Sequence, residues 1–169
     1  MNSTLSGLFL LNSQHVVEQF DCGILALNTY LLKNALQNQQ SHGARTYVVT
    51  SDNYVVGYFT LAYGSAAPDF VPIRVQKGMG KYPIPLMVIA RLAVDKSWHG
   101  KGLGKALLKH ALLKSIKAAQ IAGLRAVVVH AKDELSKSFY QKFGFVTAPF
   151  DDFHLYLLIK DIERNQKIV

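Results

Sequence analysis

The stretch that most constrains the fold of this chain runs from Met87 to Ala122, where a β-type run, a glycine-rich loop and a helical pattern follow one another. The apolar run Leu86–Val94 is interrupted only by Arg91, and the loop after it carries glycines at alternate positions, Gly100, Gly102 and Gly104. Glycines let backbone N–H groups approach an anion, and a helix N-terminus adds a partial positive charge. The arrangement therefore predicts a loop that holds a pyrophosphate, with full charges added by Lys101 and Lys105.

Two other phosphate-binding loops do not fit this stretch. A P-loop requires Ser or Thr after its Gly-Lys pair, whereas Ala106 follows Gly104 and Lys105. The dinucleotide pattern G-x-G-x-x-G requires a final glycine, which is missing whether the pattern starts at Gly100 or at Gly102. A glycine-rich turn that serves only packing is the alternative. The strand before the loop and the long basic helix after it favour the phosphate interpretation.

The composition indicates one basic globular domain. Lys and Arg total 19 against 11 Asp and Glu among 169 residues, which gives a formal net charge of +8. A surplus of this size favours a nucleic-acid partner, with a merely soluble basic surface as the alternative. The length suits a single domain over residues 1–169, and no break in composition divides it.

The sequence favours a cytoplasmic protein that makes no contact with a membrane. Its start, Met1–Thr4, lacks the basic and apolar regions of a signal peptide. The apolar runs fall far short of the roughly 20 residues that span a bilayer. Because Cys22 is the single cysteine, no internal disulfide can form, which fits a reducing compartment.

Along the chain, periodicity predicts strands and helices that build one mixed sheet covered by helices. Strands are expected at residues 7–11, 45–50, 54–63, 86–94, 124–131 and 153–159. Helices are expected after Asp21, which serves as N-cap, then from the glycine loop to Gly123, and over residues 133–143. The proline-punctuated segment 64–85 is expected to be an irregular loop, and the residues after Ile159 a polar tail.

The glycine loop resembles the acetyl-CoA loop of the GNAT acetyltransferases, whose pattern is Gln/Arg-x-x-Gly-x-Gly/Ala. Gly102 and Gly104 supply the glycines, while His99 replaces the usual Gln or Arg and can still donate a hydrogen bond to phosphate. Four segments resemble the acetyltransferase toxins of type II toxin–antitoxin modules: Phe20–Gly23, Arg91–Asp95, Gly100–Gly104 and Ser138–Phe145. The resemblance implies the α/β GNAT acyl-CoA N-acyltransferase fold, a mixed six- to seven-stranded sheet flanked by about four helices.

The resemblance also implies an activity and partners. Acetyl-CoA is the co-substrate, and the acceptor is the α-amine of an aminoacyl-tRNA, whose acetylation blocks translation. A ribbon-helix-helix antitoxin neutralises the enzyme, operator DNA is bound only through the antitoxin complex, and the toxin is a homodimer. Tyr140 is implied as the catalytic residue. The implied acetyl-CoA residues are Leu92, Ala93, Val94, His99, Gly100, Lys101, Gly102, Leu103, Gly104 and Lys105.

The chemistry of the residues agrees with this assignment. A free α-amine has a pKa of about 7.7–8.0, so an appreciable fraction is neutral near pH 7 without a strong base. The strand Leu86–Val94 accordingly contains no Asp or Glu, and we interpret Asp95 beyond it as a turn residue. A backbone N–H at the strand end can stabilise the oxyanion, and Tyr140 can protonate the departing thiolate. The alternative for Tyr140 is a core position, since Phe139 and Phe143 lie at helical spacing around it.

Four cations are candidates to guide the acceptor end of tRNA: Arg74, Lys77, Lys81 and Arg91. An internal ion pair is the alternative for Arg91, because an unpaired buried charge is costly. We expect His130 and His110 to be structural. The histidines and the single cysteine show no recognisable ligand spacing, so no metal site is predicted.

Two other functions remain open from the sequence. One is a GNAT enzyme that acetylates a small amine or a protein N-terminus. The other is an inactive module that binds CoA or nucleic acid, against which the presence of Tyr140 and of the complete glycine loop both count.

Overall fold

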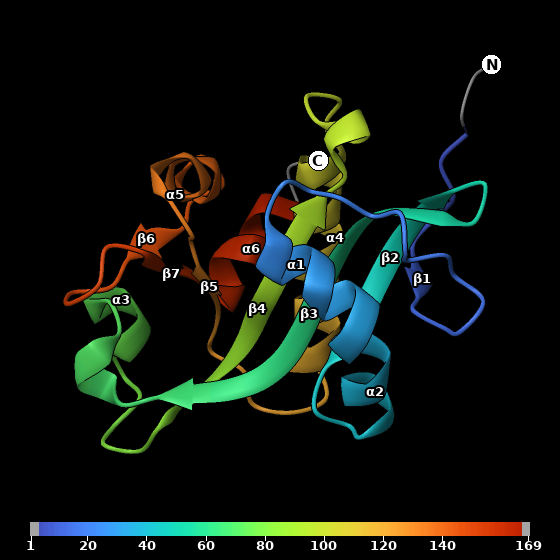
Figure 1. The fold of residues 1–169 in the computed structure, drawn as a ribbon. Helices are drawn as coiled ribbons and strands as arrows, with labels where there is room; N and C mark the ends of the chain where they lie inside the picture. The colour runs from blue at the N-terminus through green and yellow to red at the C-terminus, as the bar shows by residue number, and fades with distance from the viewer. Residues whose placement is uncertain (1–3, 167–169) are drawn as a thin grey trace. The chain divides into compact units, whose positions relative to one another are not determined.

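The computed structural model describes residues 4–166 (Figure 1). Seven strands form one sheet in the order β1-β2-β3-β4-β5-β7-β6. The pair β4–β5 is parallel, whereas β1–β2, β2–β3, β5–β7 and β6–β7 are antiparallel. The sheet is therefore mixed, as predicted. Contacts divide the chain into two compact units, the first made of the residues up to Ala62 together with Ala90–Ala111. The second unit contains Tyr63–Ile89 and the residues from Leu112 onward.

The first unit is built on a β-hairpin covered by helical turns (Figure 1). Its strands are β1 (Phe9–Leu10), β2 (Arg45–Ser51) and most of β3 (Tyr54–Ala66). The two residues between β2 and β3, Asp52 and Asn53, have φ angles of 50° and 68°, as a tight hairpin turn requires. The helical turns are α1 (Leu25–Thr29), the π-helix Tyr30–Asn34 and α2 (Ala35–Gln40). Their apolar side chains form one core with those of the hairpin, including Leu31, Ala35, Val48 and Tyr58.

The prediction that Asp21 caps the first helix is wrong. The N-cap of α1 is Ile24, which makes no side-chain capping bond. Gly23 has a φ of 92° and so inserts a turn between Asp21 and the helix. Asp21 Oδ1 instead accepts hydrogen bonds from the Gly23 backbone N–H at 2.9 Å and from Asn28 Nδ2 at 3.0 Å. The carboxylate therefore stabilises the turn rather than the helix end.

The central strand–loop–helix stretch forms as predicted. Strand β4 spans Ile84–Val94, a 3-10 turn covers Lys96–Trp98, and α4 runs over Leu103–Ala119. In the first unit, β3 approaches the start of α4 closely at Gly57. A Cβ on that glycine would lie 3.0 Å from Leu107 Cδ1 and 3.1 Å from Leu103 Cδ2. A side chain at position 57 would therefore push the helix away from the strand.

The second unit contains β5 (Ala126–His130), β6 (Val146–Thr147), β7 (His154–Leu158) and α5 (Glu134–Gln141). The helix expected over residues 133–143 is present, and Asp133 is its N-cap, since its Oδ1 accepts from the Ser136 N–H at 2.8 Å. Gly144 follows the helix with a φ of 94°. Two expectations are wrong here. The segment 64–85 contains the end of β3, a 3-10 turn at Pro68–Phe70 and helix α3 (Ile73–Gln76). The presumed polar tail forms helix α6 (Ile159–Gln166), whose Ile159 and Ile162 are buried.

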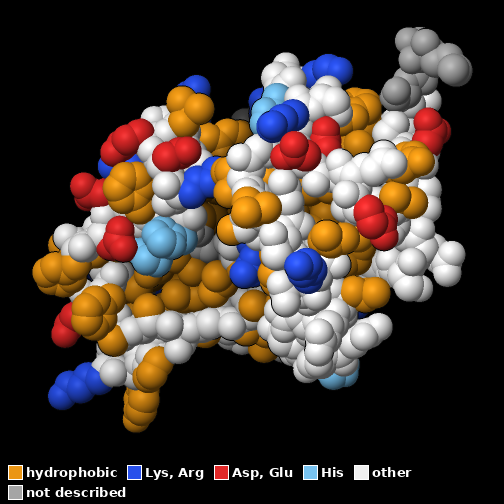
Figure 2. Space-filling model, viewed as in Figure 1, with side chains coloured by type: hydrophobic (Ala, Val, Ile, Leu, Met, Phe, Trp, Pro, Cys, Tyr) orange, Lys and Arg blue, Asp and Glu red, His pale blue; other side chains and the backbone are white. Residues whose placement is uncertain are grey.

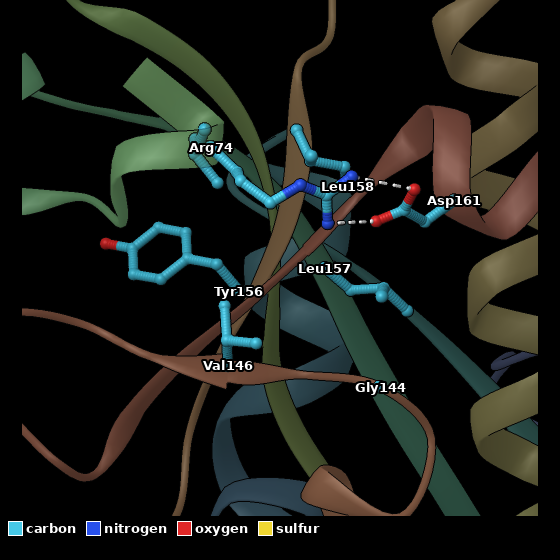
Figure 3. Close-up of a pocket in the computed structure, with 8 residues that line it drawn as sticks. Arg74, Gly144, Val146, Tyr156, Leu157, Leu158 and Asp161 are labelled. Carbon is cyan, nitrogen blue, oxygen red and sulfur yellow. Dashed lines mark hydrogen bonds and ion pairs between the residues drawn. The ribbon is translucent and has the colours of Figure 1, made fainter. Parts of the chain in front are cut away.

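Helix α3 is fixed within the second unit by two arginines. The guanidinium of Arg125 donates to the backbone carbonyls of Val75 at 2.9 Å and of Arg74 and Lys77 at 3.0 Å each. Arg74 forms a bidentate ion pair with Asp161 of α6, with N···O distances of 2.9 and 3.2 Å (Figure 3). Arg74 and Asp161 line a small pocket together with Val146 and Tyr156 (Figure 3). No helix among residues 4–166 has the length and apolarity needed to cross a bilayer.

Candidate active site

The end of β4 presents its alternate residues to opposite faces of the sheet. The Ala93 side chain is buried in the core of the first unit together with Val55 and Tyr58. Leu92 and Val94 therefore point to the other face, where both are half-buried. These two residues are the ones predicted to align the pantetheine arm along the strand.

The glycine loop has the backbone expected of a pyrophosphate cradle. Gly100 and Gly102 have φ angles of 73° and 83°, and a Cβ on either would meet no atom within 4 Å. The Ala106 N–H pairs with the Gly102 carbonyl at 3.1 Å, so the amides of residues 103–105 precede the first intrahelical bond and stay available as donors. Lys101 and Lys105 are exposed beside them. This donor set fits a pyrophosphate group.

His99, the residue that departs from the GNAT pattern, contacts the protein backbone. Its Nε2 lies 2.7 Å from the carbonyl oxygen of Val94. Because a carbonyl only accepts, this nitrogen carries the proton, and Nδ1 is the ring nitrogen left for other contacts. His99 therefore ties the start of the loop to the end of β4.

Two of the segments that resemble the toxins contact each other in the first unit. The Asp95 carboxylate accepts from the Asp21 N–H at 3.0 Å and from the Ser97 N–H and hydroxyl at 2.9 and 2.7 Å. In return, the Lys96 N–H donates to the Asp21 carbonyl at 2.8 Å. Burial raises the pKa of Asp95, but these hydrogen bonds outweigh it and hold the pKa below its usual value. The interpretation of Asp95 as a turn residue is thus confirmed.

Arg91 lies over the ring of Tyr30, with its guanidinium carbon 3.5 Å from the ring centroid. This is a cation–π contact that holds the planar group by its face. Among residues 4–166, no carboxylate forms an ion pair with Arg91, so the internal ion pair considered as an alternative is not present. The N–H groups at the edge of the guanidinium are left to contact an anion.

Tyr140 belongs to α5 in the second unit, where Phe139 and Phe145 pack edge-on against its ring at centroid distances of 5.2 and 5.5 Å. Burial raises the pKa of Tyr140 to about 12, which keeps the hydroxyl protonated at neutral pH. Every fully enclosed polar side-chain atom in the described part of the chain has a hydrogen-bond partner. The Tyr140 hydroxyl forms no hydrogen bond with another described residue, so it is not one of these enclosed atoms. The hydroxyl therefore reaches the surface while the ring is packed in the core.

The three cationic side chains of segment 64–85 also lie in the second unit, and they differ in whether they form an ion pair. Arg74 is bound to Asp161, whereas the exposed side chains of Lys77 and Lys81 form no ion pair with another described residue. The sequence analysis did not identify the role of Arg125. No motif distinguishes this arginine from the other basic residues, 19 in all, and its contact with helix α3 is known only from the structure. The sequence analysis also missed that His130 and His154 are directly opposite each other on β5 and β7.

Comparisons with known proteins identify the family to which the chain belongs. The acetyltransferase (GNAT) domain family matches residues 42–147. The "tRNA-acetylating toxin" of Mycobacterium tuberculosis strain ATCC 25618 / H37Rv is 42% identical over 145 residues, which cover 86% of this chain and 87% of the relative. A KacT variant with one tyrosine changed to phenylalanine has a similar crystal structure, with a TM-score of 0.89, 27% identity and coverage of 95% and 98% of the two chains. AtaT complexed with acetyl-methionyl-tRNAfMet gives a TM-score of 0.88 at 27% identity, with coverage of 96% and 99%.

These matches define the class of the protein. The chain belongs to the GNAT acetyltransferases, and within them to the branch of acetyltransferase toxins. The predicted GNAT fold is confirmed, and the structure has seven strands.

Proposed function

We propose that this protein is an acetyl-CoA-dependent N-acetyltransferase that acetylates the α-amine of an aminoacyl-tRNA and thereby blocks translation. The observation that carries the proposal is the open glycine loop on a GNAT fold, in a chain 42% identical to a tRNA-acetylating toxin over 86% of its length. The solved structure of AtaT with acetyl-methionyl-tRNAfMet, which shares 27% identity, supports the same acceptor class.

Acetyl-CoA supplies the acetyl group as an activated thioester. In this protein, the glycine loop and the first turn of α4 would hold the pyrophosphate, with Lys101 and Lys105 adding charge. The backbone of Leu92, Ala93 and Val94 would align the pantetheine arm. AtaT structures with acetyl-CoA support this role for the fold, because they are similar to this chain over nearly its whole length.

Transfer forms a C–N bond and breaks the C–S bond, and the amine loses the proton that the departing sulfur requires. We assign the donation to sulfur to Tyr140, whose buried ring and raised pKa keep its proton in place until then. KacT and AtaT structures with a single tyrosine changed to phenylalanine support a central tyrosine in this branch. No carboxylate base is needed, because the α-amine is partly neutral near pH 7.

On the tRNA side, we assign phosphate contacts to Arg91, Lys77 and Lys81, with Arg74 a weaker contributor because Asp161 compensates its charge. Lys and Arg side chains are spread over the face shown in Figure 2 among hydrophobic and polar ones. The net charge of +8 therefore supports attraction of a polyanion by the whole molecule, with the positioned arginine fixing one phosphate.

Partners and setting follow from the same branch. AtaT has been solved with the C-terminus of its antitoxin AtaR, and an AtaT–AtaR complex has been solved on DNA. We propose a ribbon-helix-helix antitoxin for this chain, operator DNA bound only through that complex, a homodimer and a cytoplasmic location. We also propose that both compact units belong to one domain over residues 1–169. Each unit combines two separate chain segments, and the matched GNAT region crosses both.

Binding to tRNA tests the acceptor side separately from catalysis. Affinity for charged tRNA should fall with salt, with a slope of about −0.7 to −0.9 per phosphate contacted. Arg91→Gln should make this slope less steep by the contribution of about one phosphate contact, and it should leave the affinity for acetyl-CoA unchanged. Arg45→Gln is the matched control, an exposed arginine at the start of β2. Salt-independent binding, or equal slopes for Arg91→Gln and the parent protein, would contradict the assignment.

A further inference from the structure

Two histidines of the second unit face each other on neighbouring strands. His130 is the last residue of β5 and His154 the first of β7, and the antiparallel register places them directly opposite each other. Their rings stack with centroids 4.3 Å apart and planes only 7° from parallel. His130 is exposed, and the His154 side chain is 40% exposed. Both imidazoles are therefore accessible from solvent at the ends of their strands.

A carboxylate fixes the orientation of one of these rings. Asp151 Oδ2 lies 2.6 Å from His154 Nδ1, and Asp151 Oδ1 accepts from the Phe153 N–H at 2.8 Å. An ionised carboxylate only accepts hydrogen bonds, so the proton of the neutral ring is on Nδ1 and the lone pair is on Nε2. A carboxylate that holds the N–H of a histidine in this way is the usual second partner of a metal-ligating imidazole.

We propose that His130 and His154 bind one divalent transition-metal ion of the imidazole-preferring class, such as Zn²⁺, and that Asp151 orients His154 for it. The three residues each offer a ligand atom, and these atoms all lie within 4.8 Å of one another. Imidazole is a preferred ligand for Zn²⁺, Ni²⁺ and Cu²⁺, and two protein nitrogens leave further positions to water. The site goes beyond the proposed acetyl transfer, which requires no metal.

Binding requires a small rearrangement of the rings. At Zn–N distances of about 2.0–2.1 Å, two nitrogens of a tetrahedral site lie about 3.4 Å apart. Parallel rings cannot direct their in-plane lone pairs at one point, so at least one imidazole must tilt. Neither ring is enclosed. The His130 ring forms no hydrogen bond with another described residue, whereas Asp151 holds the His154 ring, so the His130 ring is the one that can tilt out of the stack.

Sequence spacing gave no indication of this site, because its ligands are brought together by strand pairing. The two histidines are far apart in the chain, and neither belongs to a short ligand motif. Cross-strand neighbours are adjacent only once the register of β5 and β7 is known.

The test is a calorimetric titration of ZnCl₂ into the untagged, chelator-treated full-length protein. We expect one equivalent to bind, and His130→Gln and His154→Gln each to weaken binding at least tenfold. Asp151→Asn should weaken it by about 10- to 100-fold, the usual cost of losing such a partner. His110→Gln, on an exposed histidine of α4, is the matched control and should bind as the parent does.

Circular dichroism would establish that each variant is folded, so the titration reports on ligands alone. Equal binding by the parent and both strand-histidine variants would mean an adventitious ion only and would overturn the proposal. Absence of binding by the parent would overturn it as well. Because the measurement does not use activity, its outcome is independent of the proposed acetyl transfer.

Discussion

The Nε2 atom of His99 lies 2.7 Å from the carbonyl oxygen of Val94, so the glycine loop is tied to the strand that precedes it. The two residues belong to the two parts of the proposed acetyl-CoA site, the phosphate loop and the end of β4. A hydrogen bond between these parts sets where the loop amides lie with respect to the strand backbone. The imidazole thus acts as a positioning group, even though the family pattern has Gln or Arg at this position.

Removing this bond should weaken acetyl-CoA binding without abolishing it. A neutral hydrogen bond contributes about 0.5–1.5 kcal/mol, so His99→Ala should raise the Kd for acetyl-CoA by about 2- to 12-fold. His99→Gln keeps a side-chain donor and should recover part of the loss. Isothermal titration measures both. Unchanged affinity in His99→Ala would show that the bond to Val94 does not organise the loop.

A side chain on the loop should block the pyrophosphate. Gly102→Val places a branched group where backbone amides must meet the phosphates, so the Kd for acetyl-CoA should rise at least tenfold. Gly78→Val is a matched control for backbone strain, because Gly78 has the same φ of 83° and a Cβ there would also meet no atom within 4 Å. Titration should show nearly parental affinity for the control. Similar losses in the two variants would mean that strain, not the phosphate site, is responsible.

Loss of the Tyr140 hydroxyl should affect turnover rather than binding. General acid catalysis contributes about 10²–10⁴-fold, so Tyr140→Phe should lower kcat by that factor while the acetyl-CoA Kd persists. Tyr54→Phe removes an exposed hydroxyl at the start of β3 and is the control. Because burial raises the pKa of Tyr140 to about 12, this group should cause no alkaline loss of kcat below about pH 10. Full turnover by Tyr140→Phe would assign the proton to water or another group.

The ion pair between Arg74 and Asp161 should stabilise the protein only above acidic pH. The hydrogen bonds from Arg74 lower the pKa of Asp161 below its ordinary 3.8. A carboxyl whose folded-state pKa is lowered contributes stability above its unfolded pKa and loses it as pH falls through the folded value.

Arg74→Gln should therefore lower the Tm at pH 7 only slightly, because Arg74 is exposed and an exposed ion pair contributes little to stability. The difference from the parent should shrink as the pH falls below 3.8 and through the lowered pKa of Asp161. Lys77→Gln removes the same charge without breaking an ion pair and is the control in thermal melts. A pH-independent difference would show that Arg74 stabilises α3 by packing alone.

The sequence predicted the parts of the fold that depend on local pattern. The hairpin of β2 and β3, the glycine loop and the helix that begins near Asp133 all follow from short-range rules, and all three are present. The positions missed depend on contacts between distant residues. Helix α6 has a mostly polar sequence, and its two isoleucines are buried because the helix packs against the strand before it, β7. Asp21 was predicted to cap a helix, but its carboxylate accepts hydrogen bonds from the Gly23 N–H and from the Asn28 side chain instead.

The same limit applies to the candidate site. The glycine loop and Tyr140 could be proposed as site residues because their residue types and spacing match a family pattern, and the matched GNAT region contains both. The contact of His99 with Val94, the stacking of Arg91 on Tyr30 and the Arg125 clamp on α3 could not be found. Each uses a common residue whose partner is fixed only by the fold.

The central claim is that the acetyl acceptor is the α-amine of an amino acid esterified to tRNA. The most direct measurement incubates purified protein with labelled acetyl-CoA and total charged tRNA, beside deacylated tRNA and the free amino acids. The label released by mild alkali should appear as an N-acetyl amino acid from charged tRNA only, and Tyr140→Phe should reduce it by about 10²–10⁴-fold. Label appearing on free amino acids or on deacylated tRNA as readily as on charged tRNA would contradict the account.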